Sequence, residues 1–269
     1  MRVVDRLGEL NRPCAFVPTM GALHAGHQSL IQIARELCDE VIVSVFVNPL
    51  QFENKDDLAK YPKTPERDEE LAKEAGATIL WRPRYEDIYP EGYKRLSAGM
   101  VGEIYEGASR PGHFDGVVTV VNRLFEMVRP RYAIFGEKDF QQLFLIRKLA
   151  EESFPEIEII GAPTVRENSG LALSSRNVRL GTQGRIAADA ISQALRSAQD
   201  VDTLVAIQER LSTLADSPNF TLDYAEVIDE ENFQPATEST IHKRAIVAGW
   251  IDGVRLIDNM AIKPALVRS

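Results

Sequence analysis

Val41-Ile42-Val43-Ser44-Val45-Phe46-Val47 is an almost uninterrupted run of apolar, mostly β-branched residues. A strand with apolar side chains on both faces is expected inside a parallel sheet that helices cover on both sides. Similar short runs recur through the first part of the chain, separated by longer amphipathic segments. This alternation predicts an α/β fold, a Rossmann-like, doubly wound parallel sheet with right-handed crossovers.

The predicted elements change character along the chain. Strands are expected at 15–18, 41–47, 78–81, 132–135 and 157–160, and helices at 27–37, 65–75, 115–128 and 138–151. After residue 177 come helices at 183–198 and 202–215 and strands at 222–228, 244–248 and 254–257, the last two joined by a hairpin-like connection over 249–253. We therefore predict a nucleotide-binding Rossmann-like domain over residues 1–177 and a smaller C-terminal α+β lid domain over 178–269.

Composition excludes several classes of protein. The chain has 269 residues, 44% hydrophobic and 26% charged, which is typical of a globular protein with a sizeable core. Its 31 basic and 40 acidic residues give a net charge of −9, which argues against a main role in binding nucleic acid. No apolar run is long enough to span a bilayer and none resembles a signal peptide, so we expect a cytoplasmic protein. Cys14 and Cys38 are expected to be buried free thiols.

The first candidate site is Pro18-Thr19-Met20-Gly21-Ala22-Leu23-His24-Ala25-Gly26-His27, between the first predicted strand and the first helix. Open α/β sheets bind ligands at such a carboxyl strand end, and a helix N-terminus attracts anions. His24 and His27 could stabilise charge that develops on an α-phosphate during transfer. A metal site is less favoured because no third ligand stands nearby. A capped helix with incidental histidines is the structural alternative.

Phe135-Gly136-Glu137-Lys138-Asp139 also follows a buried strand and opens a helix. Its glycine permits close approach, its lysine could meet phosphate, and its acid could bind ribose hydroxyls or simply cap the helix. Along residues 165–177, two adjacent serines followed by an arginine, on a glycine-containing loop, are typical of a mobile polyphosphate clamp, with a domain linker as the alternative. Local positive charge is expected from five side chains: His24, His27, Lys138, Arg166 and Arg176.

Six blocks carry a family resemblance in their order along the chain. They are residues 18–27, 46–52 (FVNPLQF), 61–64 (YPKT), 110–117 (RPGHFDGV), 135–142 (FGEKDFQQ) and 174–177 (SSRN). Together they resemble the pantothenate synthetase, or pantoate–β-alanine ligase, family of the nucleotidylyltransferase superfamily with the H-x-G-H signature. The signature alone marks only the superfamily, whereas the combination of blocks is specific to the ligase.

The resemblance implies a cytoplasmic, homodimeric, AMP-forming carboxylate–amine ligase of pantothenate and coenzyme A biosynthesis. Such an enzyme condenses (R)-pantoate with β-alanine through a pantoyl adenylate. ATP would be a substrate, and Mg²⁺ would be held mainly by its phosphates, with no protein metal ligands expected. Neither nucleic acid nor membrane is an expected partner.

The resemblance also implies the site residues. The catalytic set is His24, His27, Lys138, Ser174, Ser175 and Arg176, with His27 as the proton donor. The ATP-binding set is Met20, Gly21, Ala22, Leu23, His24, Ala25, Gly26, His27, Gly136, Glu137, Lys138, Asp139, Val165, Leu173, Ser174, Ser175 and Arg176. Gln51 and Gln142 are expected to hold pantoate. Leu173 stands where many relatives carry methionine, a volume-conserving change.

Several residues keep more than one interpretation. Gln51 could orient a hydroxy acid through its neutral amide or bond within its own turn. His113 is expected in a turn before a helix capped by Asp115, and Asp68 is a weak candidate for a magnesium environment. Residues 53–56 differ from the commoner glycine-bearing versions of the family. The rival functions are a nucleotidylyltransferase acting on a phosphorylated or alcohol acceptor and a non-catalytic nucleotide sensor.

Overall fold

The computed structural model describes residues 1–53 and 58–262, and the chain divides into two compact units. The first comprises Met1–Glu137 and Gln141–Pro163. The second comprises Lys138–Phe140 and the described residues from Thr164 onward. The boundary predicted at 177/178 lies later in the chain than this division, since the segment after Pro163 packs with the second unit. Most of the 53–56 loop lies outside the described residues.

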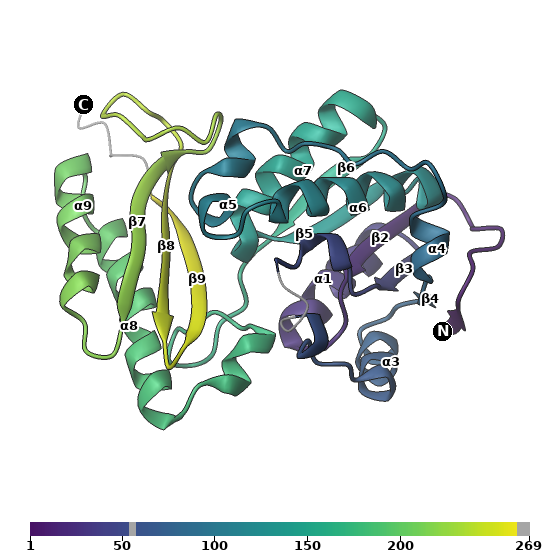
Figure 1. The fold of residues 1–269 in the computed structure, drawn as a ribbon, viewed down its shortest axis with the longest axis horizontal. Coiled ribbons are helices and arrows are strands. Elements are labelled where there is room, and N and C mark those ends of the chain that lie inside the picture. The colour runs from purple at the N-terminus through teal and green to yellow at the C-terminus, as the bar shows by residue number, and fades with distance from the viewer. Residues whose placement is uncertain (54–57, 263–269) are drawn as a thin grey trace. The chain divides into compact units, whose positions relative to one another are not determined.

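A six-stranded parallel sheet forms the first unit, which confirms the predicted doubly wound α/β fold (Figure 1). Its strand order is β1-β4-β3-β2-β5-β6. Because β2 lies between β3 and β5, the strand order reverses there, and ligands bind at such a switch point in open sheets. The bounds are β1 (Arg2–Val4), β2 (Cys14–Thr19), β3 (Glu40–Val45), β4 (Ile79–Trp81), β5 (Tyr132–Gly136) and β6 (Glu158–Ala162).

Helices cover both faces of this sheet. On one face Ile31 of α1 and Leu71 of α3 join a core with Val17 and Val43 of the strands. On the other, Phe125 of α6 meets Phe135 of β5 edge-on, with 6.4 Å between ring centroids. The helices are α1 (Ala25–Leu37), α3 (Pro65–Glu74), α4 (Tyr85–Ile88), α5 (Glu106–Ser109), α6 (His113–Val128) and α7 (Phe140–Ser153), with 3₁₀ turns η1 (Pro49–Gln51), η2 (Met100–Glu103) and η3 (Glu137–Asp139).

Two local predictions in this unit need correction. The edge strand β1 was not expected, since its three residues form a strand only by pairing with β4. Helix α6 begins at His113 and not after Asp115, because Gly112, at φ 74°, occupies the N-cap position in the left-handed conformation. Asp115 instead accepts a hydrogen bond from the main-chain N–H of Ala98 at 2.8 Å.

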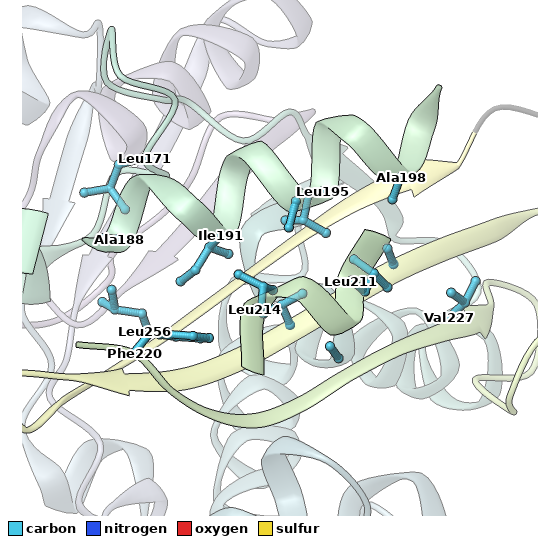
Figure 2. Packing of buried hydrophobic residues seen from close by; sticks show 14 of the residues in the cluster. Leu171, Ala188, Ile191, Leu195, Ala198, Leu211, Leu214, Phe220, Val227 and Leu256 are labelled. Atoms are coloured by element: carbon cyan, nitrogen blue, oxygen red, sulfur yellow. The ribbon is translucent and has the colours of Figure 1, made fainter. Parts of the chain in front are cut away.

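The second unit is an antiparallel sheet, ordered β7-β8-β9, that packs against two helices. Figure 2 shows Ile191 and Leu195 of α8 and Leu211 of α9 in one buried cluster with Val227 and Leu256 of the sheet. The elements are η4 (Ser175–Arg179), α8 (Thr182–Gln199), α9 (Leu204–Ser212), η5 (Thr213–Asp216), β7 (Thr221–Asp229), β8 (Lys243–Ile251) and β9 (Val254–Ile262).

The connection between β8 and β9 is tighter than predicted. Residues 249–251 continue β8, so only Asp252 and Gly253 form the turn, both at positive φ. Such a two-residue turn with positive φ matches the twist of the flanking strands. Within residues 1–53 and 58–262, no helix combines the length and the apolar character needed to cross a bilayer.

Candidate active site

The loop between β2 and α1 is held by buried hydrogen bonds. Thr19 Oγ1 donates to the carbonyl of Ser44 on β3 at 2.7 Å and accepts from the N–H of Gly21 at 3.2 Å. Gly21 has φ +84°, and a Cβ there would stand 2.9 Å from a carboxylate oxygen of Asp68. Glycine is therefore required at position 21 by the backbone conformation and by the close approach of Asp68.

His24 and His27 form a reciprocal cap on helix α1. Nδ1 of His24 accepts from the N–H of Gly26 at 3.1 Å, and Nδ1 of His27 accepts from the N–H of His24 at 3.3 Å. The ring centroids lie 4.1 Å apart. Because each Nδ1 is an acceptor, the neutral ring carries its proton on Nε2. Helix capping and phosphate binding by these histidines are therefore compatible. The cap uses Nδ1 of each ring and leaves an Nε2–H group as the donor.

Asp68, on α3, is the anchor of this loop. Its side chain is buried, and its carboxylate accepts from the N–H groups of Ala22 and Leu23 at 3.2 and 2.8 Å and from the hydroxyl of Thr64 at 3.0 Å. A carboxylate with these donors fixes the backbone that leads into the histidine cap. These contacts give Asp68 a positioning role, and the magnesium environment suggested for it stays a prediction.

The turn after β3 holds Gln51 through Asn48. Oε1 of Gln51 accepts from Nδ2 of Asn48 at 3.1 Å, while Oδ1 of Asn48 accepts from the N–H of Leu50 and from the hydroxyl of Tyr89. Asn48, and not Gln51, therefore bonds the backbone of the turn. With Oε1 of Gln51 engaged, its NH₂ group is the donor side of the amide. Burial raises the pKa of Tyr89 well above its ordinary value, so the Tyr89 hydroxyl stays a donor to Asn48.

Helix α6 packs tightly against this turn. A Cβ on Gly116 would stand 2.3 Å from the carbonyl oxygen of Leu50, so only glycine lets the helix approach. The carbonyl of Gln51 lies 2.9 Å from Nδ1 of His113 and 3.3 Å from a guanidinium nitrogen of Arg110. The block at 110–117 therefore supports the Gln51 turn, and the structural interpretation of His113 agrees with these contacts. In the sequence, Gly116 is indicated only by its place in the 110–117 block.

Two adjacent glutamines after β5, Gln141 and Gln142, have different environments. Gln141 is buried and bonds to the carbonyls of Val101 and Ile104 and to the N–H of Glu106, which fixes the loop before α5. Gln142 is half-buried in the first turn of α7. At Gly136, a Cβ would meet no atom within 4 Å, so packing within the chain does not require glycine there.

Three predicted segments of the first unit share one edge of the sheet. The histidine loop follows β2, the Gln51 turn follows β3, and Gly136 ends β5, and these three parallel strands are neighbours. Their carboxyl ends meet at the switch point identified above. The topology therefore brings together the predicted ATP-binding and pantoate-binding residues of this unit.

Lys138 and the serine–arginine segment belong to the second unit. Lys138 is largely buried, at 16% side-chain exposure, with Nζ 4.0 Å from a carboxylate oxygen of Asp139. Ser174 caps the turn η4, because its hydroxyl accepts from the N–H of Arg176 at 3.2 Å. The N–H of Leu173 donates to the carbonyl of Val165 at 2.9 Å, which ties the two ends of this segment together.

Arg166 does not contribute the unbalanced positive charge expected of it. Its guanidinium donates to both carboxylate oxygens of Asp258, at 2.6 and 2.9 Å, and to the carbonyl of Gly170 at 3.0 Å. Such a bidentate pair neutralises the charge and orients the arginine along the segment. Sequence reasoning could not find this partner, because Asp258 is remote in the chain.

The acidic and sulfur-bearing side chains form no cage for a cation in the described part of the chain. No group of three or more His, Cys, Asp or Glu residues there could hold a metal ion. Cys14 and Cys38 are buried and unbridged, which confirms that prediction. Burial raises the pKa of both thiols, so each stays protonated near neutral pH.

Comparisons with known proteins agree with one another. The family model described as pantoate-beta-alanine ligase matches residues 2–261. A pantothenate synthetase of Rhizorhabdus wittichii is 44% identical over 97% of this chain and 95% of its own length. That of Thermus thermophilus is 43% identical over 98% of this chain and 100% of its own length.

Solved structures give the same result at the level of the fold. The crystal structure of pantothenate synthetase from Thermus thermophilus superposes with a TM-score of 0.91, at 42% identity, over 98% of this chain and 100% of that one. A pantoate-beta-alanine ligase from Francisella tularensis, complexed with beta-gamma ATP and beta-alanine, superposes with a TM-score of 0.80. It is 36% identical, with 97% of each chain covered.

Proposed function

This chain belongs to the pantoate–β-alanine ligase family, and on that premise we propose how its residues carry out the reaction. The reaction is the ATP-dependent, AMP-forming condensation of (R)-pantoate with β-alanine to pantothenate. The residue-level proposal rests on one observation. His24 and His27 cap helix α1 at the switch point through Nδ1, which leaves the Nε2–H of each ring as a donor.

In the first step, a carboxylate oxygen of pantoate attacks the α-phosphorus of ATP. The bond to the bridging oxygen breaks, pyrophosphate leaves, and pantoyl adenylate is formed. His24 and His27 donate hydrogen bonds from Nε2–H to the phosphate oxygens on which charge develops, and no proton is transferred in this step. Lys138, Ser174, Ser175 and Arg176 are assigned to the same anionic groups.

Gln51 is assigned to pantoate through its NH₂ group. Its carbonyl oxygen is engaged by Asn48, so the amide presents donors to a hydroxyl or carboxylate oxygen of the substrate. A neutral donor orients the hydroxy acid without competing with ATP for positive charge. Gln142 is assigned to the same substrate.

In the second step, the amine of β-alanine attacks the acyl carbon of pantoyl adenylate. The acyl–oxygen bond breaks, AMP leaves with that oxygen, and the amine gives up a proton to solvent. No side chain becomes covalently attached, so catalysis depends on positioning and on charge neutralisation.

Mg²⁺ fits this site as a companion of ATP. Asp68, the acid considered for it, is occupied by main-chain donors, and the described residues offer no three-ligand cluster. Bound to phosphate oxygens, Mg²⁺ would neutralise the charge of the departing pyrophosphate. A cytoplasmic homodimer completes the proposal, and light scattering on the purified chain would test the dimer.

Isotope exchange between pyrophosphate and ATP tests the adenylate mechanism. We expect exchange with MgATP and pantoate in the absence of β-alanine, and none when pantoate is omitted. Folded protein that supports no pantoate-dependent exchange would exclude a reversible adenylate step. A nucleotidylyltransferase would need a different acceptor, and a nucleotide sensor would bind ATP without exchange.

A further inference from the structure

We infer that Asn259, on strand β9 of the second unit, is a positioning residue for the ATP-binding lysine, Lys138. The inference rests on the function proposed for Lys138. Nδ2 of Asn259 donates to the main-chain carbonyl of Lys138 at 2.9 Å. The two residues are far apart in sequence but belong to the same compact unit.

The orientation of the Asn259 amide is fixed from its other side. Oδ1 of Asn259 accepts from the guanidinium of Arg244, on β8, at 2.6 Å. Both residues are buried, with 4% and 6% exposure. A buried amide whose oxygen receives a charged donor must present its NH₂ group elsewhere, and here that group meets the carbonyl of Lys138.

Arg244 also contacts Phe140, which follows Lys138 and Asp139 in the chain. Its guanidinium carbon lies 3.8 Å from the ring centroid of Phe140, and its Nε donates to a carboxylate oxygen of Glu230 at 2.7 Å. The Phe140 ring is in turn stacked on Phe233, with centroids 6.2 Å apart. The carbonyl of Lys138 and the ring of Phe140 are therefore held by one pair of side chains, which fixes the 3₁₀ turn that carries the lysine.

The neighbouring residue, Asp258, holds the other predicted ATP-binding segment of this unit. Its carboxylate pairs with Arg166, as described above, and also accepts from the N–H of Asn259 at 2.8 Å. The guanidinium of Arg166 reaches the carbonyl of Asn259 at 3.3 Å. Adjacent residues of β9 thus set both the Lys138 turn and the segment that leads to Ser174 and Arg176.

Asn259→Asp separates positioning from packing. The aspartate keeps the shape of the side chain and an oxygen for Arg244, but it loses the donor to the Lys138 carbonyl and places negative charge there. We expect the KM for ATP in pantoate-dependent exchange to rise about 3- to 10-fold, the effect of one hydrogen bond. The KM for pantoate should change little, whereas the melting temperature should fall, because the aspartate places a buried charge beside a carbonyl.

Two further variants keep this test decisive. Asn259→Ala removes the donor without adding charge. If the aspartate variant does not fold, the KM for ATP of the alanine variant replaces it in the test and should also rise. Gln199→Ala is the matched control, because Gln199 donates to the carbonyl of Ala261 on the same strand at 2.7 Å but does not reach Lys138. It should leave the KM for ATP unchanged.

The outcomes distinguish this inference from the proposed function. A lower melting temperature with an unchanged KM for ATP in both Asn259 variants would assign Asn259 to stability alone and overturn the inference. Lys138→Ala, measured in parallel, should raise the KM for ATP or lower turnover strongly. If that variant behaves like the wild type, both the role of Lys138 and the inference about Asn259 are wrong.

Discussion

The two units fix their predicted site residues by different kinds of contact. In the first unit, the His27 side chain accepts from the N–H of His24, three residues earlier, and Asn48 holds Gln51 at the same spacing. In the second, Lys138 and Arg166 depend on Asp258 and Asn259, which lie about a hundred residues later. The contacts of the histidine cap and of Asn48 with Gln51 are neutral and local, whereas the Arg166–Asp258 pair is charged and joins distant segments.

This difference has an energetic consequence. Local hydrogen bonds order a short stretch of chain, and each contributes about 0.5–1.5 kcal/mol. A buried ion pair contributes little on balance, but removal of one partner is costly, because the other charge stays buried. We therefore expect loss of one partner of the Arg166–Asp258 pair to act first on stability, and loss of a histidine of the α1 cap to act mainly on catalysis.

Asp258→Ala should have the largest effect on stability. The side chain of Asp258 is 5% exposed and that of its partner Arg166 is 18% exposed, so we expect a loss of about 3–5 kcal/mol in the free energy of unfolding, measured in urea. Glu151→Ala is the control, because it breaks an exposed pair with Lys148 and should leave the free energy of unfolding almost unchanged. Equal losses in the two variants would remove the distinction between buried and exposed pairs.

His27→Ala should lower turnover by about 10²–10³-fold, the effect of losing a donor to a charge that develops in the transition state. His27→Asn separates chemistry from capping, since its Oδ1 can still accept from the N–H of His24 while the Nε2–H is lost. Both variants should lose activity, and the asparagine variant should keep more of the stability. Near-normal kcat in either would remove the assigned role.

The fold was predictable where the pattern is local and apolar. The β-branched runs located five of the six strands of the parallel sheet, and the glycine- and histidine-rich loop was placed correctly at the end of β2. Strand β1 was missed because it is short and is ordered by pairing with β4. The helix start at His113 was missed because Gly112, in a left-handed conformation, replaced the acidic cap expected at Asp115.

The site was predictable only in part, because local sequence patterns do not show contacts between distant segments. Sequence patterns single out His24, His27 and Gln51, but for Asp68 they suggest only a magnesium environment and not its bonds to the histidine loop, and they give Arg166 a charge that its partner cancels. These roles depend on contacts between segments remote in sequence, as between Asp68 and Leu23 or between Arg166 and Asp258. Local spacing carries no information about such partners.

Asp68→Asn should have an intermediate effect. The amide replaces one carboxylate oxygen by a donor that faces main-chain N–H or hydroxyl donors, so we expect a loss of about 1–3 kcal/mol in stability and a higher KM for ATP. Thr64→Val removes only the hydroxyl that donates to Asp68 and should cost about 1 kcal/mol with less effect on ATP. An unchanged KM for ATP in Asp68→Asn would show that the loop keeps its geometry without the carboxylate.

Tyr89→Phe should have the smallest effect, about 1 kcal/mol in stability and a modest rise in the KM for pantoate through Asn48 and Gln51. The pKa of Tyr89 is raised by burial, so the folded protein keeps a proton that the unfolded chain releases above the ordinary pKa of about 10. This contribution is present below that pH and is lost as the pH rises. The wild type should therefore lose more stability than Tyr89→Phe in urea titrations above pH 10. Parallel pH profiles would contradict this.

The most direct test of the account follows the oxygen atoms of pantoate. Because a carboxylate oxygen attacks the α-phosphorus and leaves with AMP, pantoate labelled with ¹⁸O in its carboxylate should transfer one label to AMP in each turnover. Mass spectrometry of the products should find this label in AMP and none in pyrophosphate. Unlabelled AMP, with the label found in inorganic phosphate or in pyrophosphate, would contradict an adenylate intermediate.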